Sequence, residues 1–152
     1  MSVHSFSIVQ KIPISVQDAW KFFSRAENLQ LITPPNFQFK ILTTLDGRPI
    51  YEGQIIDYTV RPLFNIRMRW RTIITKVEED LLFIDEQQLG PFRYWQHKHH
   101  FKPVNGGTEM TDELKYEIPG WFAGDIINAV LIGKDIRKLF DYRYLQIKER
   151  FG

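Results

Sequence analysis

Residues 92–117 read FRYWQHKHHFKPVNGGTEMTDELKYE, two alternating runs on either side of Asn105-Gly106 that decide the fold. Asn-Gly between such runs favours a two-residue hairpin turn, which places Val104 opposite Gly107. Side chains alternate between the faces of a strand, so this register also fixes which residues share a face. One face carries Trp95, His97, His99 and Phe101 opposite Tyr116, Leu114, Asp112 and Met110. The alternate residues are polar or charged, and we predict that they face solvent.

Further strands precede this hairpin. Six segments separated by short turn signals read as strands: 37–45, 50–60, 65–77, 81–89, 92–103 and 107–118. Short connections join antiparallel neighbours, so the six segments form a meander. Before them, 3–11 alternates as a first strand, and Ser15 with Asp18 marks the start of a short helix. A second short helical segment, 27–32, ends before Pro34.

The C-terminal part reads as one long helix from about residue 125 to residue 150. It lacks proline, and apolar residues recur every three or four positions: Ile132, Ile136, Leu139, Phe140, Ile147 and Phe151. The predicted order is β-α-α-β6-α, an α+β fold in which a curved antiparallel sheet of about seven strands wraps around this helix. One helix does not fill the concave side of such a sheet, which leaves an internal cavity. We expect residues 1–152 to form a single ligand-binding domain.

Composition excludes several classes of protein. A hydrophobic content of 43% and an aromatic content of 14% exclude disorder. The absence of Cys excludes disulfides, thiolate nucleophiles and Cys-ligated metals, and favours a reducing cytoplasm. We see no signal peptide and no apolar run near the ~20 residues that span a bilayer, so we expect a cytoplasmic protein without stable membrane insertion. The net charge of +2 predicts no nucleic-acid partner.

The register argument extends to two earlier strands. A two-residue turn at Gly90-Pro91 directs these side chains inward: Leu82, Ile84, Glu86 and Gln88. A three-residue turn before that strand adds Ile66, Met68, Trp70, Thr72 and Ile74, and leaves Arg67, Arg69 and Arg71 outside as a solvated stripe. On the helix, Arg143 falls in register with Ile136 and Phe140, so it also points inward. Polar groups that converge in an apolar concavity are typical of small-molecule sites.

Several motifs on these elements resemble the SRPBCC superfamily, which includes START-related and pathogenesis-related-allergen-like proteins. They are Gly90-Pro91-Phe92-x-x-Trp95-x-His97-x-His99-x-Phe101, Thr108-x-Met110-x-Asp112-x-x-x-Tyr116-x-x-Pro119 and Phe140-x-x-Arg143. Leu31-Ile32-Thr33-Pro34-Pro35 is similar to an uncharacterised bacterial-type subgroup. The resemblance covers essentially the whole chain. It implies a helix-grip fold with a deep hydrophobic cavity, and relatives such as lipid carriers, polyketide cyclases and coenzyme Q-binding proteins.

We therefore predict that the chain binds or carries a small hydrophobic molecule with one polar end, which is lipid-, polyketide- or quinone-like. The expected ligand-binding residues are Met68, Trp70, Ile84, Glu86, Trp95, His97, His99, Asp112, Leu114, Tyr116, Trp121, Phe122, Ile136, Phe140 and Arg143. Trp121 and Phe122 stand in the loop before the helix, where they form a mobile lid or plug the cavity mouth. Arg143 either anchors the polar end of the ligand or ties the helix to the sheet through a salt bridge.

Other readings remain open for the polar residues. His99 oriented by Asp112 would serve as a general base in cyclase-, aromatase- or hydrolase-like chemistry. The His97-x-His99 spacing with Glu86 or Asp112 is compatible with a two-His, one-carboxylate metal site, but this signal is weak and we predict no metal and no cofactor. A third reading is an adaptor with a vestigial pocket that binds another protein. The sequence leaves the oligomeric state open.

Overall fold

The computed structural model describes residues 3–63, 66–118 and 126–152. In chain order the elements are β1 (His4–Ile12), α1 (Val16–Phe23), the short 3-10 helices η1 (Ala26–Ile32) and η2 (Pro35–Phe37), β2 (Lys40–Ile41), β3 (Ile55–Leu63), β4 (Ile66–Glu78), β5 (Leu82–Leu89), β6 (Tyr94–Val104), β7 (Gly107–Glu117) and α2 (Ile126–Phe151). The order confirms the predicted α+β arrangement, in which six strands and a long helix follow one strand and short helical segments.

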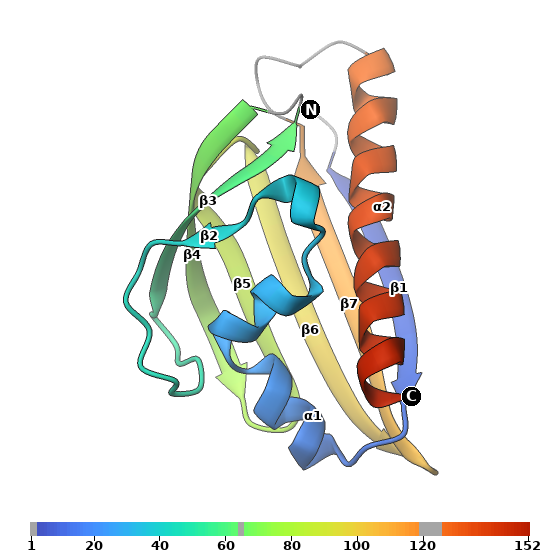
Figure 1. The fold of residues 1–152 in the computed structure, drawn as a ribbon. Coiled ribbons are helices and arrows are strands. Elements are labelled where there is room, and N and C mark those ends of the chain that lie inside the picture. The colour runs from blue at the N-terminus through green and yellow to red at the C-terminus, as the bar shows by residue number, and fades with distance from the viewer. Residues whose placement is uncertain (1–2, 64–65, 119–125) are drawn as a thin grey trace.

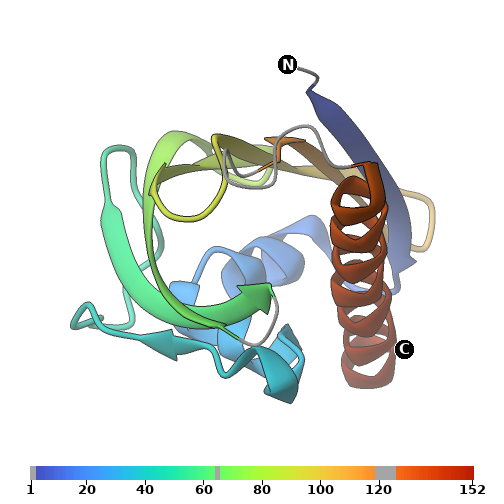
Figure 2. The same cartoon turned by 90° about the horizontal axis from the view of Figure 1, so that it is seen from above.

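The seven strands form one antiparallel sheet in the order β1-β7-β6-β5-β4-β3-β2. Strands β2 to β7 succeed each other as the predicted meander, and β1 pairs with β7 at the far edge. Figure 1 shows α2 running along the sheet beside β7 and β1, with α1 and the short helices across the other part of the concave face. From above, the curved sheet surrounds an interior that α2 closes on one side (Figure 2). This is the helix-grip fold.

The β6–β7 hairpin has the predicted register. Val104 pairs with Gly107, and His99 pairs with Asp112. Gly107 is required for close packing, because a Cβ atom there would lie 2.0 Å from the carbonyl oxygen of Ile12 at the end of β1. The hairpin therefore brings β1, β6 and β7 together and fixes which of their side chains face the interior.

The β5–β6 register differs from the prediction by one residue. Asp85 pairs with His97, so Asp85 shares the inner face of the sheet with that histidine. Glu86 and Ile84 pair with Gln96 and Lys98, which lie on the outer face. The inner carboxylate of β5 is therefore that of Asp85, and the predicted inward positions of Glu86 and Ile84 were wrong.

A side chain explains this shift. The connection between β5 and β6 is not a two-residue turn at Gly90-Pro91 but a four-residue loop, 90–93. Gln87 organises this loop: its Nε2 donates to the carbonyl oxygen of Phe92 (2.6 Å), and its Oε1 accepts from the backbone N–H of Phe92 (3.0 Å). These two bonds replace the backbone pairing of a tight turn, and the longer loop moves every β5 side chain to the opposite face.

The inner face of β4 was predicted correctly. Glu78 pairs with Leu82, which leaves the predicted three-residue turn between β4 and β5. Trp70, Thr72 and Ile74 are buried on that face. On the outer face, Arg71 forms a fork with Asp57, with an Nε to Oδ1 distance of 2.8 Å and an Nη2 to Oδ2 distance of 3.1 Å.

The N-terminal strands of the meander are shorter than predicted. Segment 37–45 contains only the two-residue strand β2, and β3 begins at Ile55 rather than at residue 50. Gln38 adopts the left-handed conformation with a φ of 48°, which interrupts an extended run. The N–H of Ile50 donates to the carbonyl oxygen of Ser24 at the end of α1 (2.8 Å), so this segment joins the helical part of the molecule and not a strand.

Helix α2 packs on the sheet through a buried stripe. Ile132, Ile136, Phe140, Arg143 and Ile147 are all buried, at spacings of three and four residues. The inward position of Arg143 thus confirms the prediction. None of the helices in the described part of the chain has the length and apolar run that crossing a bilayer requires.

Candidate functional site

A cavity of about 190 Å³ lies between the inner face of the sheet and the helices. Its wall is mostly aromatic and aliphatic. Helix α2 contributes Ile132, Ile136, Leu139 and Phe140; strands β3 to β6 contribute Ile56, Tyr58, Val60, Trp70, Ile74, Phe83 and Trp95; the segment from α1 to β2 contributes Phe22, Phe23, Leu29, Ile32, Phe37, Phe39 and Ile41. Such a wall offers contacts to an apolar molecule.

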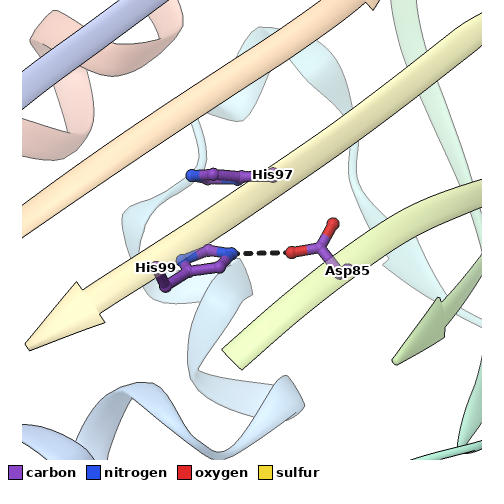
Figure 3. A group of neighbouring side chains, drawn as sticks. All are labelled: Asp85, His97 and His99. Atoms are coloured by element: carbon purple, nitrogen blue, oxygen red, sulfur yellow. Dashed lines mark hydrogen bonds and ion pairs between the residues drawn. The ribbon is translucent and has the colours of Figure 1, made fainter. Parts of the chain in front are cut away.

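Polar groups meet at one part of this wall. Asp85 on β5, His97 and His99 on β6, and Arg143 on α2 line the cavity, and Asp112 on β7 lies behind the histidines. We call these five residues the polar floor. The two imidazole rings lie one above the other along β6, with Asp85 pointing at His99 from the neighbouring strand (Figure 3). Their ring centroids are 3.7 Å apart.

The two aspartates hold the two histidines in place. Nε2 of His99 lies 2.6 Å from Oδ2 of Asp85, and its Nδ1 lies 3.4 Å from Oδ1 of Asp112. Nε2 of His97 lies 2.8 Å from the same Asp112 oxygen. An ionised carboxylate only accepts hydrogen bonds, so each of these imidazole nitrogens acts as the donor. His99 is therefore paired on both nitrogens, whereas Nδ1 of His97 has no partner among the residues that the structure describes.

The floor favours opposite charge states for the two histidines. Burial disfavours the charged form of His99, but hydrogen bonds to Asp112 and Asp85 outweigh burial and raise its pKa above the ordinary value. Burial, followed by the charge of His99, lowers the pKa of His97 below the ordinary value. At a pH between these two pKa values, His99 is an imidazolium and the adjacent His97 is a neutral imidazole.

The carboxylates remain ionised next to these rings. Burial alone would raise the pKa of Asp112, but hydrogen bonds from His97 and His99 hold it well below the ordinary value. Asp85 shows the same balance, since the hydrogen bond from His99 overcomes burial and lowers its pKa. Two negative charges on the floor therefore face the positive charges of His99 and Arg143.

Arg143 differs from the other floor residues because it forms no hydrogen bond or salt bridge to a described side chain, although its charge helps to lower the pKa of Asp85 and of Asp112. Its side chain is 8% exposed, and its Nε is fully buried without a hydrogen-bond partner. Among the described residues, Arg143 forms no salt bridge, and its guanidinium carbon lies 5.4 Å from the centre of the Phe140 ring. Of the two alternatives for Arg143, a salt bridge that ties the helix to the sheet is therefore not formed among the described residues. The cation is held over an aromatic ring at the cavity wall.

The floor also contains three residues of the type that bind metals. Asp85, His97 and His99 offer three potential ligand atoms within 4.8 Å of each other, with Asp85 in the place expected for Glu86 or Asp112. The 2.6 Å contact between His99 Nε2 and Asp85 is a hydrogen bond, and the proton in it occupies the lone pair that a metal would need. A metal would therefore bind here only in exchange for that proton, and the expected absence of a metal stays a prediction.

The structure separates the predicted site residues into three groups. Those that line the cavity are Trp70, Trp95, His97, His99, Ile136, Phe140 and Arg143. Those that do not line it are Met68, Ile84, Glu86, Asp112, Leu114 and Tyr116. Of the second group, Leu114 and Tyr116 pack in the core under α2, and Asp112 supports the histidines. Trp121 and Phe122 lie outside the described residues.

Sequence reasoning missed two parts of the site. The first is Asp85, which the one-residue register shift hid. The second is the part of the wall built by α1, η1 and β2, including Phe22, Phe23 and Phe39. A signal for the second part was available, because five aromatic residues in 20–39 exceed what one short amphipathic helix can bury.

An antiparallel sheet folded around a C-terminal helix, with an apolar cavity between them, defines the helix-grip class of proteins. Residues 12–140 match the family described as polyketide cyclase / dehydrase and lipid transport, and the chain belongs to this family. Membership confirms the resemblance seen in the sequence and supports binding of hydrophobic ligands in general. A search of curated protein sequences finds no significant match.

Solved structures show the same fold at low sequence identity. Protein Ms6760 from Mycobacterium smegmatis is 15% identical, with a TM-score of 0.69 over 100% of this chain and 96% of that chain. Ara h 8.0201 is 14% identical, with a TM-score of 0.69 over 99% and 98% of the two chains. Norcoclaurine synthase from Thalictrum flavum, solved as a point mutant with a transition state analogue, is 17% identical, with a TM-score of 0.68 over 99% and 98%.

Proposed function

We propose that the protein binds or carries a small hydrophobic molecule in the cavity, with the polar end of the molecule on the polar floor. The observation that carries this proposal is the cavity itself, an apolar space of about 190 Å³ that ends on buried, ordered ionisable groups. A domain that needed only a core would gain by filling such a space, because voids reduce stability. The family match supports the same reading.

The volume favours a compact ligand. A cavity of ~150 Å³ accommodates benzene in a well-studied engineered case, so about 190 Å³ suits one or two fused rings. Of the lipid-, polyketide- and quinone-like classes, the quinone-like and short polyketide-like molecules fit this size best. Their rings would contact Trp70, Trp95 and Phe140, and their oxygens would meet the floor.

Native mass spectrometry tests this proposal. The protein is exposed to an organic extract of cells, desalted and weighed intact, and the same is done with Ile136→Trp and Leu131→Trp. Ile136 is buried and lines the cavity, whereas Leu131 is exposed on the same helix. We expect a small-molecule mass increment on the wild type and on Leu131→Trp, and a reduced increment on Ile136→Trp. Equal increments on all three proteins, or none on the wild type, would contradict ligand binding in this cavity.

A second candidate function is acid–base catalysis on the bound molecule. The observation that favours it is the adjacent neutral His97, with an unpaired Nδ1, and charged His99, because such a pair provides a base and an acid. The base in this arrangement is His97 supported by Asp112, in place of the predicted His99 supported by Asp112. A carrier and an enzyme make opposite predictions for deuterium exchange.

The exchange experiment uses a bound ligand that has a carbonyl group. In D2O, an enzyme of this kind accelerates deuterium incorporation at the carbon next to the carbonyl, and His97→Gln abolishes the acceleration while the mass increment persists. A carrier leaves the exchange rate of the ligand at its value in buffer. The wild-type rate relative to buffer therefore decides between the two functions.

A further inference from the structure

We propose that the polar floor recognises a carboxylate, so that the cavity selects compact one- or two-ring molecules that carry one carboxylate group. This inference rests on the proposed function and adds the chemical class of the polar end. It starts from Arg143, the one residue of the floor that forms no hydrogen bond or salt bridge with a side chain that the structure describes.

Arg143 is buried and lacks a hydrogen-bond acceptor among the residues that the structure describes. It is 8% exposed, and its Nε has no hydrogen-bond partner. The two carboxylates of the floor are engaged by histidines, Asp85 by His99 and Asp112 by His97. A buried N–H group without an acceptor is unfavourable for folding, and a ligand oxygen at the cavity wall would supply the acceptor that Arg143 lacks.

The shape of the guanidinium narrows the choice of counter-charge. Its planar fork matches the two oxygens of a carboxylate, which it binds through two parallel hydrogen bonds. The surrounding wall is aromatic, and the volume of about 190 Å³ is too small for a sterol or a two-chain lipid. A molecule with one or two rings and one carboxylate therefore satisfies both the wall and the floor.

The charges on the floor predict that the protein takes up a proton when a carboxylate binds. Charged and titratable groups surround His97 on several elements. Asp85 lies on β5, His99 on β6 and Asp112 on β7. Arg143 and Asp135 line the cavity from α2, and Arg25 lines it from the loop after α1. Two aspartates, protonated His99 and Arg143 balance each other. A ligand carboxylate adds one negative charge, which a proton from solvent offsets at the free Nδ1 of His97.

Calorimetry with a matched pair of probes tests the inference. The probes are 1-naphthoate and its neutral analogue 1-naphthamide, and the proteins are the wild type, Arg143→Met, Arg143→Lys and the control Arg137→Met. Arg137 is exposed on the same helix and lies over the Phe6 ring. We expect the wild type to bind naphthoate at least tenfold more tightly than naphthamide, because only naphthoate pairs with the fork.

The variants separate charge recognition from cavity binding. We expect Arg143→Met to weaken naphthoate binding at least tenfold and to change naphthamide binding less than threefold, with Arg143→Lys in between and Arg137→Met unchanged. Titrations in buffers of different ionisation enthalpy should show proton uptake when naphthoate binds, and less uptake in His97→Gln. The wild-type comparison of the two probes requires no variant to fold.

Two outcomes overturn the inference in distinguishable ways. If naphthamide binds the wild type as tightly as naphthoate, or if Arg143→Met binds naphthoate like the wild type, carboxylate recognition is refuted while the proposed ligand binding stands. If neither probe binds the wild type and the native mass increment is absent as well, both the inference and the proposed function fail.

Discussion

The contact between Asp85 and His99 allows a sharp test of the floor, because the adjacent residue serves as the control. Asp85→Asn keeps the size of the side chain and removes its charge. Glu86→Gln makes the same chemical change one position later, on the outer face of β5. The two variants differ only in the face they occupy, so their comparison also tests the β5–β6 register.

The structure gives the expected magnitude. Asp85→Asn removes a charged hydrogen bond of 2.6 Å, an interaction that contributes about 1.5–3 kcal/mol. Removing one partner of a fully buried ion pair costs about 3–5 kcal/mol, but the amide oxygen of Asn still accepts from His99, and Asp112 remains its second partner. We expect a loss of about 2–3 kcal/mol at pH 6 for Asp85→Asn, and less than about 0.5 kcal/mol for Glu86→Gln.

The loss of stability in Asp85→Asn should depend on pH, and the two pKa shifts give its direction. The raised pKa of His99 stabilises the fold fully below about 6.5, and this contribution disappears as the pH rises through the folded-state pKa. The lowered pKa of Asp85 stabilises the fold above about 3.8, and this contribution disappears as the pH falls through the folded-state pKa. Since both contributions need the Asp85–His99 contact, the difference between wild type and variant is largest between about pH 4 and 6.5.

Urea unfolding at several pH values, followed by far-UV circular dichroism, measures this profile, and histidine NMR reports the pKa of His99 directly. We expect that pKa to fall in Asp85→Asn and to stay constant in Glu86→Gln. A loss of stability that is equal in the two variants, or one that does not vary with pH, would refute both the register and the charge assignment.

The other predictions concern the floor, the core and the hairpin. His97→Gln should flatten the loss of stability as the pH falls below about 6.5 in urea titrations, because the lowered pKa of His97 favours protonation of the unfolded chain there. Phe140→Ala should reduce the free energy of unfolding by about 3 kcal/mol, the low end for a buried Phe, because one side of this ring already borders the cavity. Gly107→Ala should lower the free energy of unfolding by at least about 2 kcal/mol, since its Cβ would meet the Ile12 carbonyl oxygen. Gly106→Ala should lose only about 1 kcal/mol, because its φ is positive but its Cβ would meet only Lys11 Nζ, at an ordinary contact distance of 3.7 Å.

Sequence reasoning succeeded where local chemistry determines geometry. Asn105-Gly106 fixes a two-residue turn, and that turn set the register of β6 and β7, so the pairing of His99 with Asp112 followed. The periodicity of the last helix likewise identified Arg143 as an inward-facing cation. In both cases neighbouring residues along the chain carry the information.

Sequence reasoning failed where a side chain made the hydrogen bonds that backbone groups make in a tight turn. Nothing in Gly90-Pro91 shows that Gln87 will bond to both the N–H and the carbonyl of Phe92 and lengthen the turn. Because strand periodicity is two, this single contact exchanged Glu86 for Asp85 at the floor. The part of the cavity wall built by α1, η1 and β2 was missed for a related reason. The helical turns of 26–37 are short and irregular, and tertiary packing decides which of their side chains face inward.

The cavity lies between parts of the chain that are far apart in sequence, residues 22–41 on one side and residues 132–143 on the other. A molecule in this space touches both and joins them as a temporary crosslink. At a hundredfold excess over its dissociation constant, a ligand adds about 2.7 kcal/mol to the free energy of unfolding, which lowers the unfolded population about a hundredfold. Degradation in the cell acts on that population, so occupied molecules persist and empty ones are removed. The abundance of the protein would then follow the supply of its ligand without any dedicated regulator.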